Sequence, residues 1–96
     1  MYTYHFKLRA KSTEDAEIVC RFYRQSLQLI PKPGFVRGTY AIGYEDRRTI
    51  LIEQHWGSLP ALQAWLSSDT RRQLIAEIAD LVDGPGEISI YEESPA

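Results

Sequence analysis

The chain has 96 residues, a formal net charge of −2, and 11 basic and 13 acidic side chains intermixed along its length. This length predicts a single domain over residues 1–96, and the charge balance argues against nucleic acid or an anionic membrane as a partner. A single cysteine excludes an intrachain disulfide, and no apolar run reaches the roughly 20 residues that span a bilayer. The N-terminal residues alternate in polarity instead of forming the apolar centre of a signal peptide, so we expect a cytoplasmic location.

The first third of the chain predicts a strand followed by a helix. Residues 2–10 alternate between apolar and polar side chains, as in a strand with one buried face. Ser12 with Asp15 resembles a capping box and opens a helix. The inward stripe of this helix is Ala16, Val19, Cys20, Tyr23 and Leu27. Phe22 lies beside that stripe, and the prolines and glycine of residues 31–34 end the helix.

A hairpin is predicted next, over residues 35–56. Alternation places Val36 and Tyr40 on one face of its first strand. Phe35 falls on the opposite face, and the polar segment 45–48 makes the turn. The second strand directs Ile50, Ile52, Gln54 and Trp56 to one side.

The remaining residues predict two helices and a last strand. Ser58 begins the first helix, with Pro60 in its first turn, and Asp69 can cap the second. The inward stripe of the second helix is Leu74, Ile75, Ile78, Leu81 and Val82. A break at residues 83–86 precedes a strand over residues 87–93. The order βαββαβ predicts an α+β, ferredoxin-like fold in which helices cover one face of a four-stranded antiparallel sheet.

The other face of the predicted sheet carries charged residues together with Leu51 and Tyr91. A small domain with exposed edge strands gains stability by pairing, so we expect a second copy to cover this face in a homodimer. Glu53 and His55 lie two residues apart on the same face. They suit an acid–base pair, but we favour a salt bridge at the dimer interface.

Several strings of residues, in this order and spacing, carry a resemblance to a known family. They are RFYRQ, PGFVRG, IEQHWGSLPALQAWLSSD and the terminal EISIYEE. Over nearly the whole chain the sequence resembles the antibiotic biosynthesis monooxygenase family of dimeric α/β barrel proteins. The resemblance implies that the domain pairs into a dimeric α/β barrel. Members of that family include cofactor-independent monooxygenases that form quinones from polycyclic aromatics, haem-degrading enzymes and isomerase-like relatives.

The haem-degrading branch of this family is not matched at its polar positions. Trp65 corresponds to the cavity tryptophan of that branch, but Ile75 stands where the branch has its iron-binding histidine. Phe6 stands where it has an asparagine. Because isoleucine cannot coordinate iron, we do not expect haem degradation. The histidines, the cysteine and the carboxylates show no metal-ligand spacing either, so we expect neither a cofactor nor a metal.

The expected site is an apolar, aromatic-rich chamber between the helices and the sheet. The candidate substrate-binding residues are Phe6, Phe22, Tyr23, Tyr40, Trp65 and Arg71. Arg71 lies on an inward stripe, where it could hold a phenolate, carboxylate or quinone oxygen or, alternatively, extend over apolar atoms to water. Trp56 also faces inward, and we interpret it as a packing residue. No histidine or carboxylate is predicted on this side, so the catalytic residues remain unknown.

The resemblance implies a cofactor-independent monooxygenase that uses molecular oxygen to convert a small or polycyclic aromatic phenol or hydroquinone into a quinone. Desolvation, orientation and stabilisation of the phenolate would be the contribution of the protein. Two alternatives remain open at this point. One is a non-catalytic dimer that binds an aromatic metabolite, and the other is an isomerase or lyase that acts on a small molecule without oxygen.

Overall fold

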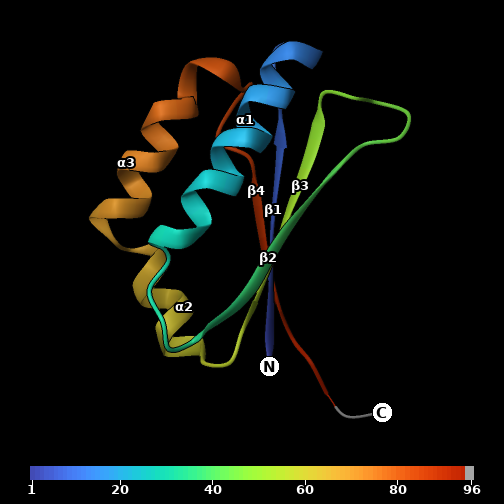
Figure 1. The fold of residues 1–96 in the computed structure, drawn as a ribbon. Helices are drawn as coiled ribbons and strands as arrows, with labels where there is room; N and C mark the ends of the chain where they lie inside the picture. The colour runs from blue at the N-terminus through green and yellow to red at the C-terminus, as the bar shows by residue number, and fades with distance from the viewer. Residues whose placement is uncertain (95–96) are drawn as a thin grey trace.

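Four strands form one antiparallel sheet in the order β2-β3-β1-β4 (Figure 1). The computed structural model describes residues 1–94. The strands are β1 (Tyr2–Arg9), β2 (Phe35–Ile42), β3 (Thr49–Trp56) and β4 (Glu87–Glu92). The helical elements are α1 (Thr13–Ser26), η1 (Leu27–Leu29), α2 (Leu59–Leu66), α3 (Asp69–Ile78) and η2 (Ala79–Leu81), where η denotes a 3₁₀ turn. The helices lie on one face of the sheet, which confirms the predicted α+β, ferredoxin-like fold.

Every α-helix starts at a serine whose hydroxyl oxygen accepts a backbone N–H from the first turn. The caps are Ser12 for α1, Ser58 for α2 and Ser68 for α3. The prediction of Asp69 as the third cap is wrong, because Ser68 Oγ accepts from the Arg71 N–H at 3.2 Å and Asp69 is already helical. The carboxylate of Asp69 instead lies in the first turn, where the helix dipole favours negative charge. No helix within residues 1–94 combines the length and apolar composition that a membrane span requires.

A bulge near the start of β2 changes which side chains face the helices. Phe35 pairs with Trp56 and Arg37 pairs with His55, so Val36 is an extra residue that opposes nothing on β3. The Phe35 ring therefore packs inward against the Trp56 ring, with 5.3 Å between the centroids, while Val36 is exposed. The predicted faces of Phe35 and Val36 are wrong for this reason. After the bulge the predicted alternation holds, and Tyr40 pairs with Ile52 on the helix side.

The core lies between the helices and the inner face of β1 and β3. Its largest fully buried side chains are Trp56, Tyr4, Ile50, Leu62 and Val19. Strand β4 differs, because all six of its residues are exposed. Ile88 and Ile90 pair with Phe6 and Tyr4 and so point to the helix side, but they remain 49% and 41% exposed. The helices cover the centre of the sheet and leave this edge open.

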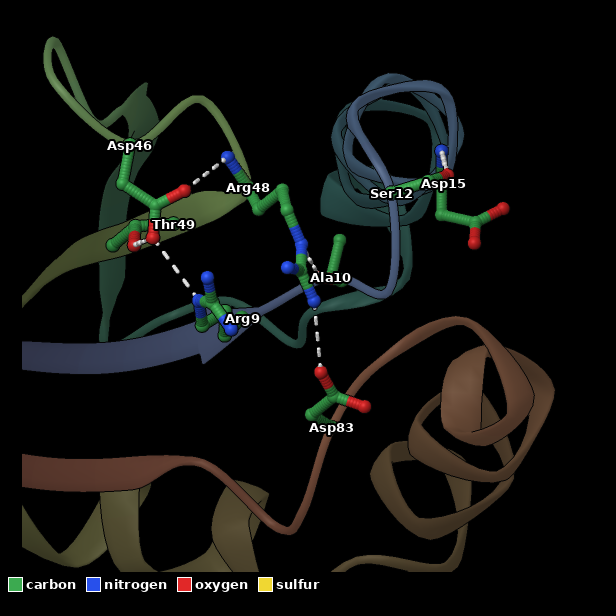
Figure 2. Close-up of polar contacts among 8 residues, drawn as sticks. All are labelled: Arg9, Ala10, Ser12, Asp15, Asp46, Arg48, Thr49 and Asp83. Carbon is green, nitrogen blue, oxygen red and sulfur yellow. Dashed lines mark hydrogen bonds and ion pairs between the residues drawn. The ribbon is translucent and has the colours of Figure 1, made fainter.

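Polar side chains join three connections at the end of the sheet where β1 stops (Figure 2). In the β2–β3 turn, Asp46 Oδ2 accepts from Arg9 Nε at 3.0 Å. Arg48 Nε donates to the carbonyl of Ala10 at 2.8 Å, and its Nη2 pairs with Asp83 Oδ2 at 3.1 Å. The hairpin turn is therefore tied both to the end of β1 and to the loop that leads into β4.

Gly34, just before β2, is a point at which a side chain cannot be accommodated. Its φ is +116°, and a Cβ there would lie 2.6 Å from the Ala61 Cβ of α2. We expect Gly34→Ala to lower the free energy of unfolding in urea by about 2–3 kcal/mol, because backbone strain and overpacking act together. Gly84→Ala is the matched control, since Gly84 also has positive φ, at +74°, but nothing lies within 4 Å of its missing Cβ. Equal losses in the two variants would contradict the tight contact with α2.

Candidate functional site

A cavity opens between the inner face of the sheet and the helices. The sheet contributes Tyr4, Phe6, Ile52 and Gln54 to its walls. The helical side contributes Phe22, Tyr23, Trp65, Arg71 and Ile75, among others. The centre of a water molecule can move through about 60 Å³ of this space, which is room for a few waters. A larger ligand would therefore require the side chains at the mouth to move apart.

Arg71 and Tyr4 form a polar pair in this cavity. Arg71 Nη2 donates to Tyr4 Oη at 3.0 Å, and the guanidinium carbon lies 5.4 Å from the centroid of the Phe6 ring. These contacts hold the cation beside the cavity instead of extending it freely into water. Burial raises the pKa of Tyr4, although the nearby Arg71 charge acts in the opposite direction. At neutral pH the pair thus presents one positive charge and one neutral phenol.

A second group of polar atoms lies on the sheet side of the cavity. Trp56 Nε1 donates to Gln54 Oε1 at 3.0 Å, and Gln54 Nε2 lies 3.4 Å from Tyr23 Oη. Gln54 and Trp56 are 4% and 1% exposed, so these bonds satisfy polar atoms that are buried from bulk solvent. Burial raises the pKa of Tyr23 to about 12.

The structure brings together most of the side chains that the sequence predicted for this site. Phe6, Phe22, Tyr23, Trp65 and Arg71 line the cavity. Tyr40 does not line it. Its ring packs edge-on against the Tyr23 ring at 6.3 Å, and its hydroxyl accepts from Arg24 Nη2 at 2.8 Å in an exposed position.

Sequence reasoning missed three polar residues of the cavity, Tyr4, Gln54 and Ser26. Tyr4 and Gln54 were placed correctly on the inner face of their strands, and each carries a polar group that needs a partner there. A polar side chain at an inward strand position was the available signal. What the sequence did not reveal was the register that makes Tyr4 and Gln54 direct neighbours across β1 and β3.

The histidines lie on the opposite face of the sheet. His5 Nε2 is 2.9 Å from Glu53 Oε1, and His55 lies 3.4 Å from carboxylate oxygens of both Glu53 and Glu93. The hydrogen bond with His5 lowers the pKa of Glu53, and one with Thr3 lowers that of Glu93. These groups lie in contact within one chain, and none of them lines the cavity.

The cavity can therefore bind and orient a ligand more readily than it can exchange protons with it. No histidine, aspartate or glutamate from residues 1–94 lines its walls. In that same part of the chain, no three potential ligands gather into a site that could hold a metal ion. The polar groups of the cavity walls are a guanidinium, two phenols, an amide and the Ser26 hydroxyl, which donates to the Phe22 carbonyl. In apolar surroundings, this combination suits a planar molecule that carries oxygen atoms.

Solved structures with the same fold include proteins assigned to antibiotic biosynthesis. A protein from Deinococcus radiodurans, provisionally named an antibiotic biosynthesis monooxygenase, is 24% identical with a TM-score of 0.85 over 100% of this chain and 95% of its own. The ActVA-Orf6 monooxygenase of Streptomyces coelicolor, solved with nanaomycin D, is 18% identical with a TM-score of 0.83 over 99% and 88% of the chains. SnoaB of Streptomyces nogalater, a cofactor-independent oxygenase, is 17% identical with a TM-score of 0.77 over 99% and 94%.

No family model matches the sequence, and a comparison with curated proteins finds no match. The similarity to solved structures nevertheless extends over the whole chain, and at these identities it establishes the fold. The shared fold does not assign a reaction, because one fold supports many chemistries. A reaction can therefore be inferred only from the residues that line the cavity.

Burial of the Tyr23 phenol makes the stability of the protein vary with pH in the alkaline range. The native state holds the Tyr23 proton more tightly than the unfolded chain does, because the pKa rises from 10.0 to about 12. The contribution of the buried phenol to the free energy of unfolding is fully present below pH 10 and is lost as the pH rises toward about 12. We expect the free energy of unfolding to fall less steeply over this range in Tyr23→Phe than in the wild type, as measured by urea unfolding at each pH. Parallel pH profiles would contradict the burial of this phenol.

Proposed function

We propose that this protein is a cofactor-independent monooxygenase that oxidises an electron-rich phenol or hydroquinone to a quinone in the cavity between the helices and the sheet. The observation that carries the proposal is the Arg71–Tyr4 pair, which sets one cation and one phenol in apolar walls. The fold is consistent with it, because two solved structures with this fold are named an oxygenase and a monooxygenase. The chain thus belongs, on this proposal, with the antibiotic biosynthesis monooxygenases.

The reaction needs only the phenol and molecular oxygen. The phenolate ring donates electrons to oxygen, and a carbon–oxygen bond forms at a ring carbon that carries hydrogen. Cleavage of the oxygen–oxygen bond leaves one oxygen atom as the new carbonyl. The other oxygen leaves as water with two hydrogens, one from the ring carbon and one from the hydroxyl. All four electrons that reduce oxygen come from the substrate ring, so no further reductant is required.

The role of the protein in this reaction is electrostatic and geometric. The Arg71 guanidinium stabilises the phenolate, and it lies in an apolar cavity where a charge acts more strongly than in water. The phenolic proton passes to water at the mouth of the cavity, because no carboxylate or imidazole from the described residues lines the walls. The rings of Phe6, Phe22 and Trp65 hold the aromatic plane and exclude water from the reacting carbon.

A non-catalytic aromatic-binding protein is the second candidate. The absence of a carboxylate or imidazole among the described cavity-lining residues favours it, because a general base speeds proton removal by a large factor. The two candidates differ in one measurable property. The enzyme consumes oxygen in the presence of its ligand, whereas the binding protein gains thermal stability from the ligand without consuming oxygen.

Loss of the cavity cation tests the enzyme. We expect Arg71→Met to lower kcat/KM for phenol oxidation by about 100-fold, because the phenolate loses its positive partner. The measurement is oxygen uptake with a panel of phenols, naphthols and anthrones, and isotopically labelled oxygen should place one label in the product. Arg72→Met is the matched control, since Arg72 is exposed and donates to the carbonyl of Ser67. Activity that survives Arg71→Met, or that a metal chelator abolishes, would contradict the proposal.

A homodimer is part of the same proposal, with the sheet face opposite the helices as its interface. Tyr91 is 54% exposed on that face, where its ring meets the His5 ring at 5.4 Å. An exposed tyrosine on a salt-bridged sheet face is a good anchor for a second copy. The cluster of His5, Glu53 and His55 lies on the same face and would then be part of the interface.

A charge at Tyr91 tests the dimer. We expect light scattering to give twice the chain mass of 11.0 kDa for the wild type. Tyr91→Asp should weaken association roughly 30-fold, as for the loss of a central aromatic anchor. Tyr44→Asp makes the same chemical change at a residue in the β2–β3 turn that is 92% exposed, and it should leave the mass unchanged. A monomeric wild type would contradict this arrangement.

A further inference from the structure

Gln54 is a buried amide whose orientation is fixed from one side. Its oxygen accepts from the Trp56 indole at 3.0 Å, so its nitrogen must point the other way, toward Tyr23 and the cavity. A glutamine nitrogen carries two hydrogens, and within residues 1–94 the one hydrogen bond that it donates, to Tyr23 Oη, is long at 3.4 Å. The cavity wall therefore holds an oriented N–H donor, the Gln54 amide nitrogen, that makes only a weak hydrogen bond.

The Tyr23 hydroxyl occupies space that β2 leaves for it. A Cβ at Gly38 would lie 2.6 Å from Tyr23 Oη, so only glycine at this position permits the observed placement. Gly38 is also the strand partner of Gln54, which brings the hydroxyl directly over the amide. Tyr23 Oη accepts from Gln54, and no acceptor from residues 1–94 takes its own proton. The hydroxyl therefore keeps a hydrogen that it can donate to a ligand.

The same arrangement occurs at the neighbouring position on β1. Tyr4 pairs with Gln54 across the strands, its hydroxyl accepts from Arg71, and within the described residues its proton also lacks an acceptor. Burial raises the pKa of both Tyr4 and Tyr23, which keeps both hydroxyls protonated at neutral pH. The cavity thus carries two phenol donors, one from β1 and one from α1, and each contacts a second polar side chain.

We propose that Tyr23 and Gln54 form a second oxygen-binding subsite beside that of Arg71 and Tyr4, so that the cavity selects aromatic molecules with two oxygen atoms over those with one. The inference rests on the proposed function, since it takes a phenol as the ligand. A ligand with one oxygen leaves one pair of buried donors without a partner, and an unpaired buried polar group is costly. The second oxygen is a hydroxyl or a carbonyl, because both accept a hydrogen bond.

Binding without oxygen tests this subsite independently of turnover. The probes are 1-naphthol and its 1,4-, 1,5- and 1,8-dihydroxy counterparts, titrated anaerobically against tryptophan fluorescence. We expect at least one dihydroxynaphthalene to bind the wild type about tenfold more tightly than 1-naphthol. This preference should fall to about twofold or less in Tyr23→Phe and in Gln54→Leu.

Tyr40→Phe is the matched control, because it removes a phenol oxygen that contacts Arg24 outside the cavity. It should retain the full preference. Tyr23→Phe keeps the ring and its packing, so a loss of preference with unchanged thermal stability cannot be attributed to unfolding. Equal affinity of the wild type for all four probes, or a preference that survives both Tyr23→Phe and Gln54→Leu, would overturn the subsite alone. No binding of any probe would overturn both the subsite and the proposed function.

Discussion

The need to satisfy one buried amide shapes the structure around the cavity. Gln54 lies in the centre of the sheet, is 4% exposed, and must find partners for an oxygen and a nitrogen away from bulk solvent. Trp56 meets the oxygen and Tyr23 meets the nitrogen, and the hydroxyl of Tyr23 requires the bare backbone of Gly38. Loss of the polar atom of Trp56 or Tyr23 would leave part of the amide unpaired, and a side chain at Gly38 would displace the Tyr23 hydroxyl. Polar contacts as well as apolar packing therefore link β2, β3 and α1.

Much of this structure follows from the sequence, and the exceptions have physical causes. Alternating strands, serine caps and helical stripes were sufficient for the fold, because those patterns are local. Phe35 and Val36 were assigned to the wrong faces because a bulge shifts the period of a strand without a marker in its composition. In the cavity, the inward direction of Arg71 was predictable, but its bond to Tyr4 was not, since it joins residues 67 positions apart through the packing of α3 on β1.

The two faces of the sheet have different electrostatic characters. The outer face holds a cluster of His5, Glu53 and His55, whereas the inner face holds a guanidinium, phenols and an amide. Groups that exchange protons near neutral pH are thereby separated from the cavity by the thickness of the sheet. Chemistry in the cavity must then depend on the reactivity of the bound molecule, with the protein supplying charge stabilisation and the exclusion of water.

The bulge at Val36 also makes the two edges of the sheet unequal. An edge strand with a bulge is a poor template for another strand, because its N–H and C=O groups no longer follow a regular repeat. Strand β4, at the other edge, pairs with β1 over six consecutive residues without a shift and exposes Ile88 and Ile90. Addition of a further strand is therefore disfavoured at the bulged end of β2 and favoured along β4. Aggregation or ordered assembly through added strands would then proceed from the β4 edge.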